Sequence, residues 1–116
     1  MHEYSVVRSL LREVRRVVPV ELHEQVRRIR VQAGEFSGID GDLLALAFEQ
    51  MIPDTEFSRA LLVVERIPLR GRCEQCGVES MIEGFRFQCR LCNSGQLTIT
   101  SGEGFLLESV TIEERD

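Results

Sequence analysis

Apolar and polar residues follow two different periods in the first half of this chain. Between residues 5 and 18, seven apolar positions recur at helical spacing, while arginines and a glutamate fill the opposite face. Pro19 ends this predicted helix because proline has no N–H for the next turn. Residues 28–33 then alternate between polar and apolar, which is the period of a half-buried strand.

The second half of the chain continues the pattern. Asp40 is a good N-cap for a second helix, which carries apolar residues such as Leu44 and Phe48 and is closed by Pro53. Residues 61–69 form a β-rich run, and residues 105–113 form a last strand whose apolar side chains need a sheet to pack in. We therefore predict an α+β fold, with a small three-stranded sheet covered by two helices on one face.

All four cysteines of the chain lie between the last two predicted strands. They form two C-x-x-C pairs, Cys73 with Cys76 and Cys89 with Cys92. Each pair makes a tight knuckle that directs two sulfurs at one point, so the set predicts a four-thiolate zinc site. Such a closed site has no open coordination position, which makes the zinc structural and not catalytic.

The interval between the knuckles predicts a short hairpin. Residues 80–82 and 85–87 flank Glu83-Gly84, a turn signal, as in a zinc ribbon. This zinc-ribbon module, residues 71–103, is predicted to be inserted between two strands of the α+β part. The other domain is then residues 1–70 plus 104–116. His23 is expected to be a solvated residue of the turn before the first strand.

Composition limits the classes of partner and compartment. The net charge of −5 over 116 residues argues against a nucleic-acid binder, which should be basic. No signal peptide or membrane-spanning run is visible, so we expect no membrane association. A cytoplasmic location is expected, where thiolates stay reduced and free to bind metal. No catalytic set of residues stands out, and we do not expect an enzyme.

The chain opens Met1-His2-Glu3, which is a second candidate metal site. A histidine at position 2 lets one ion reach the Met1 amino group, the backbone nitrogens of His2 and Glu3, and the His2 imidazole. These nitrogens form a nearly planar set, which suits Ni(II) and Cu(II) better than Zn(II). Whether the Glu3 carboxylate tunes the site or only its backbone nitrogen binds is left open.

Taken together, these residues resemble the HypA/HybF family. The resemblance covers nearly the whole chain: residues 1–5, the loop of residues 34–40, the second helix, both cysteine knuckles and the glycine-rich approach to the last strand. The conjunction of Met1-His2-Glu3 with the two cysteine knuckles is specific to it. Arg90 stands where the family often has proline, but none of the departures touches a proposed ligand.

The resemblance implies a nickel metallochaperone for [NiFe]-hydrogenase maturation, with urease as a further client in some members. It implies that His2 is the nickel ligand, that Glu3 belongs to the same motif, and that the zinc is structural. It also implies a HypB-type GTPase and the hydrogenase large subunit as partners. Two alternatives stay open at this point: a zinc-ribbon interaction or transcription accessory module with no nickel role, and a small metalloenzyme that uses the terminal site.

Overall fold

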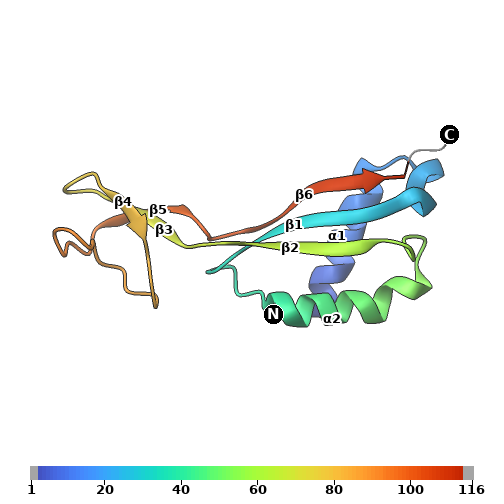
Figure 1. Cartoon of the computed structure of the whole chain (residues 1–116), viewed down its shortest axis with the longest axis horizontal. Helices are drawn as coiled ribbons and strands as arrows, with labels where there is room; N and C mark the ends of the chain where they lie inside the picture. Colours follow the sequence, from blue (N-terminus) through green and yellow to red (C-terminus); the bar gives the residue numbers. More distant parts are fainter. Residues whose placement is uncertain (1–2, 114–116) are drawn as a thin grey trace.

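The computed structural model describes residues 3–113, and Figure 1 shows its elements spread along one long axis. Short 3-10 helices, Val20–Gln25 and Ile52–Asp54, lie between the longer elements. The α-helices and strands are α1 Glu3–Val17, β1 Val26–Gly34, α2 Gly41–Met51, β2 Leu61–Ile67, β3 Arg70–Cys73, β4 Glu79–Met81, β5 Leu97–Ser101 and β6 Phe105–Ile112. No helix within residues 3–113 is long and apolar enough to cross a bilayer.

The first sheet has the strand order β2-β1-β6 and is covered by α1 and α2 on one face, so the predicted fold class is confirmed (Figure 1). β1 and β2 are parallel and joined through α2, whereas β6 returns antiparallel to β1. Asp40 caps α2 as expected, because its carboxylate accepts from the backbone N–H groups of Asp42 and Leu43. The apolar stripe of α1 is buried with β1 and α2 in one core, which includes Val7, Leu10, Val14, Ile29, Val31, Leu44 and Phe48.

The prediction that His23 is a solvated residue of the turn is wrong. His23 is only 7% exposed, and its Nε2 lies 2.8 Å from the carbonyl oxygen of Val18, to which it donates. The centroid of its ring lies 5.0 Å from the centroid of the Phe57 ring. The segment after Pro19 is a 3-10 helix folded against the core, and a single histidine in a polar stretch carries no periodic signal that would reveal this.

Next to His23, Arg15 holds the carboxylate of Glu56 through two hydrogen bonds of 2.8 Å. The hydrogen bond from Arg15 lowers the pKa of Glu56 from about 4.5 to about 2. Since the native pKa lies below the ordinary value, the pair stabilises the fold above about pH 4.5 and loses its effect as the pH falls towards 2.

We therefore expect Glu56→Gln to lower the free energy of unfolding at neutral pH by about 0.5–1 kcal/mol, the range of a surface ion pair. The difference from the wild-type protein should shrink steadily below about pH 4.5. Urea unfolding at a series of pH values measures it, with Glu49→Gln on the exposed face of α2 as a matched control. A difference that stays constant down to the acid limit would contradict the assignment.

The second sheet has the order β4-β3-β5, with both pairings antiparallel. The β-rich run of residues 61–69 is a strand only as far as Ile67, because Pro68 has no N–H to continue the ladder of β2, and β3 begins at Arg70. The predicted hairpin between residues 80–82 and 85–87 is wrong. β4 pairs with β3 instead, and residues 85–87 form no strand, because the rings of Phe85 and Phe87 pack against Phe36 of the loop after β1.

The chain crosses between the two sheets at three closely packed backbone segments. Gly34 N donates to Gly104 O, Phe36 N donates to Gly102 O, and Glu35 N donates to Ile67 O, at 2.8–2.9 Å. A Cβ on Gly34 would lie 2.3 Å from the Gly102 oxygen, so only glycine permits this approach. The Glu35 carboxylate accepts from Leu69 N at 3.1 Å and closes the crossing on its third side.

Candidate metal centre

The second sheet brings the four predicted cysteines together. Their sulfurs all lie within 4.8 Å of one another, although the two pairs are separated by twelve residues. The Cys73 and Cys92 sulfurs are 3.6 Å apart, and those of Cys76 and Cys89 are 3.5 Å apart. A tetrahedron with metal–sulfur distances near 2.3 Å has its sulfurs about 3.8 Å apart, so the geometry fits one zinc ion.

Each cysteine pair is shaped by its local backbone. The N–H groups of Gln75 and Cys76 point at the Cys73 sulfur, and that of Leu91 points at the Cys89 sulfur, all at 3.4 Å. These bonds turn the first cysteine of each pair inward, where it is buried, while Cys76 and Cys92 stay exposed. Gly77 and Asn93, each following its pair, have positive φ angles of 78° and 62° and complete the two knuckles.

The same contacts separate the acidities of the thiols. The backbone N–H of Cys76, followed by that of Gln75, lowers the pKa of Cys73 to about 6. At Cys76 the N–H of Val78 acts in the same direction, but the hydrogen bond with Cys89 and partial desolvation outweigh it and raise the pKa to about 11. Four thiolates so close together therefore need a cation among them to ionise fully, which is what a bound metal supplies.

The other predicted site falls largely outside the described residues. Met1 and His2 lie before residue 3, so nothing in the structure tests their role as ligands. Glu3 is the first residue of α1 and is half-buried. The structure does not bring the cysteine cluster and the start of α1 together, because the second sheet lies at the far end of the long axis (Figure 1).

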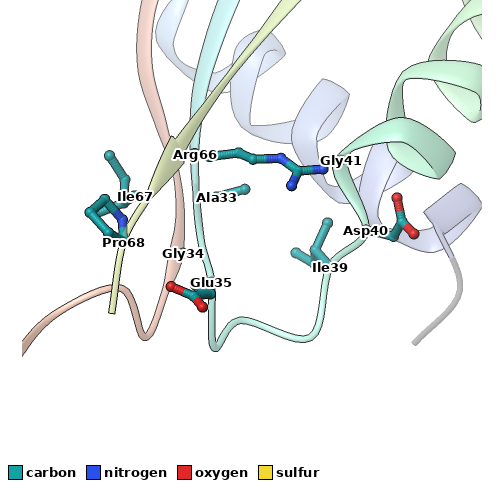
Figure 2. A pocket seen from close by; sticks show the side chains of 9 residues that line it. All are labelled: Ala33, Gly34, Glu35, Ile39, Asp40, Gly41, Arg66, Ile67 and Pro68. Carbon is teal, nitrogen blue, oxygen red and sulfur yellow. The ribbon is translucent and has the colours of Figure 1, made fainter. Parts of the chain in front are cut away.

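A hollow of about 440 Å³ lies between α2 and the carboxyl ends of β1 and β2, where Figure 2 shows Arg66 extending toward Gly41. The sequence predicted Asp40 as a helix cap and the loop of residues 34–40 as part of the resemblance, but it predicted no binding site here. Two of the hollow's acidic groups already have structural tasks, since Asp40 caps α2 and Glu35 accepts from Leu69 N. A glutamate directly after a strand-ending glycine was the one available signal, and it indicates a turn and not a site.

Comparison with known proteins identifies the family to which this chain is similar. Residues 1–112 match the family model described as "Hydrogenase/urease nickel incorporation, metallochaperone, hypA". The hydrogenase maturation factor HypA of Desulfitobacterium hafniense is 31% identical over 98% of this chain and 100% of its own length. That of Wolinella succinogenes is 32% identical over all of this chain and 98% of its own.

The solved structures agree with the sequence comparison. The solution structure of the Ni metallochaperone HypA from Helicobacter pylori superposes with a TM-score of 0.67 at 27% identity, covering 97% of each chain. A second HypA solution structure gives a TM-score of 0.69 over the same shares. These neighbours share the fold as well as the sequence pattern. The chain therefore belongs to the HypA family of nickel-incorporation metallochaperones for hydrogenase maturation.

Proposed function

We propose that this chain carries one Ni(II) ion at its N-terminus, with His2 as the principal ligand, and delivers it to the large subunit of a [NiFe]-hydrogenase. The observation that carries the proposal is Met1-His2-Glu3 at the start of a chain that matches the nickel-incorporation family from residue 1. Nickel is the cargo in this proposal. The family description also names urease, which we include as a second client.

The start of α1 supports this ligand set. Glu3 is the first described residue of α1, so its N–H is one of the first four helical donors, which have no acceptor within the helix. It can be given up to a metal without breaking the helix. Loss of two backbone amide protons also cancels the charge of Ni(II), which removes the repulsion that a cation would meet at a helix N-terminus.

The remaining proposals concern zinc, partners and organisation. We assign one structural zinc to Cys73, Cys76, Cys89 and Cys92, on the fit of the sulfur positions. The family supports a HypB-type GTPase as the working partner. The two separate sheets support a nickel-binding domain of residues 1–70 plus 104–116 and a zinc domain of residues 71–103. Four thiols in this arrangement suit a reducing compartment, which supports the cytoplasm.

His2→Ala tests the nickel site. We expect it to abolish specific Ni(II) binding while zinc content and thermal stability stay close to those of the wild-type protein. The chain has only one other histidine, so His23→Gln is the matched control. Glutamine can still donate to the Val18 carbonyl, and this variant should bind nickel normally. Calorimetric titration and metal analysis measure both, and loss of zinc or early melting in His2→Ala would make His2 structural instead.

A further inference from the structure

Within residues 3–113, the outer edge of β6 is an unpaired strand edge beside a groove. Among these residues β6 is a terminal strand of its sheet and pairs only with β1. Gly104 O accepts from Gly34 N, and Phe105 and Leu107 lie opposite Ala33 and Val31. Because pairs alternate in an antiparallel ladder, the N–H and C=O groups of Phe105 and Leu107 point away from β1, toward the open edge.

A groove of about 750 Å³ runs along this edge between α1 and β6. Its floor is apolar, with Val6 and Leu10 of α1 on one side and Phe105 and Leu107 on the other. A second hollow of about 460 Å³ shares Glu13 and Leu107 with it and continues along β6 as far as Ile112. A strand edge that borders a long apolar groove is the arrangement that binds an extended peptide by adding one strand.

The charges around the groove indicate which kind of partner segment fits it. Among the described residues, the charged lining residues are Glu13 and Glu103, the adjoining hollow adds Glu108, and neither hollow is lined by a basic residue. Glu13 pairs with Arg16 and Glu108 with Arg30, whereas Glu103 has no ion pair within residues 3–113. A second copy of this chain paired edge to edge would bring the same acids together. An incoming strand with a basic residue beside Glu103 fits instead.

The first half of the β6 edge is better suited to pair with an added strand than the second half. A register irregularity near Glu108 interrupts the later part of the edge, in the way bulges usually protect exposed strands. Phe105–Leu107 has no bulge, proline or charged side chain, and Leu106 is 51% exposed on the open face of the sheet. We propose that this half of β6 binds an extended segment of a partner protein, with apolar side chains at alternate positions and a basic residue next to Glu103.

The test uses the full zinc-loaded chain without nickel, so its failure says nothing about nickel carriage. The probe is a fluorescent, end-blocked peptide Arg-Val-Thr-Val-Thr-Val. Two N-methylated versions block one strand edge each, either at the valines or at the threonines. Strand addition predicts that one version loses binding by about tenfold or more while the other retains it. Equal loss in both, equal retention in both, or no binding by the unmodified peptide would overturn the proposal.

Protein variants and amide exchange give independent readouts. Ser9→Arg on the groove face of α1 should weaken peptide binding about tenfold, whereas Ser58→Arg, the same substitution on an exposed loop, should not. Glu103→Gln should weaken peptide binding more than the control substitution Glu24→Gln does. On binding, the amide protons of Phe105 and Leu107 should exchange more slowly and that of Leu106 should not change. Protection on β2 instead, or dimerisation of the chain seen by sedimentation, would contradict the assignment.

Discussion

Replacing Cys76 with alanine is expected to remove the zinc and unfold the second sheet, while α1, α2 and the first sheet survive. The apparent binding energy of a structural zinc site is about 10–16 kcal/mol at neutral pH and is also folding energy for the segment that forms the site. The second sheet has little else to replace it. Of the residues from 70 to 103, only Gly71, Cys73, Ile82, Cys89 and Gly102 are buried.

Zinc analysis and two-dimensional NMR measure this outcome. The signals of β3, β4 and β5 should collapse to unfolded positions, and those of β1 should remain. Leu91→Ala is the matched control, because Leu91 lies between two ligands but its side chain is 72% exposed. Its backbone N–H, which points at the Cys89 sulfur, is kept. One zinc per chain retained in the Cys76 variant would show that the four cysteines do not form the site.

Gly102→Ala is expected to be among the most damaging substitutions outside the cysteines. Gly102 has a φ of +91°, and a Cβ there would lie 2.6 Å from the Cα of Leu69. The clash is with backbone, which cannot move aside without opening the crossing between the sheets. We expect a loss on the order of 3 kcal/mol in the free energy of unfolding.

Gly38→Ala separates the clash from the backbone conformation. Gly38 also has a positive φ, of +79°, but a Cβ there would meet nothing within 4 Å. It should lose only about 1 kcal/mol, the cost of a left-handed conformation for alanine. Urea unfolding of both variants measures the difference. A Gly102 variant no less stable than the Gly38 variant would mean that the crossing is not closely packed.

The first sheet could be predicted because its elements repeat with clear periods. The stripe of α1, the cap at Asp40 and the alternation in β1 each follow from local chemistry, and β6 required a partner because its apolar residues need a sheet. The parallel pairing of β1 with β2 could not be predicted from the sequence. It depends on α2 returning the chain to the same end of the sheet, which no single segment of sequence shows.

The second sheet was predicted in the meeting of its four cysteines and mispredicted in its strands. The cysteine spacing fixes where the sulfurs meet, but the strands there are only three to five residues long. At that length, a turn signal such as Glu83-Gly84 does not reveal which segments pair. β3 pairs with both β4 and β5, and the rings of Phe85 and Phe87 pack against the ring of Phe36. Such contacts between distant segments leave no pattern in the local sequence.

The central claim is that nickel binds at the free N-terminus through His2, and the state of the Met1 amine tests it most directly. Acetylation of Met1 removes this ligand and leaves the side chains, the zinc and the fold unchanged. Calorimetric titration of Ni(II) into zinc-loaded protein should show one specific site per chain with a free N-terminus and none after acetylation. Equal affinity and stoichiometry in the two forms would place the nickel elsewhere and contradict the account.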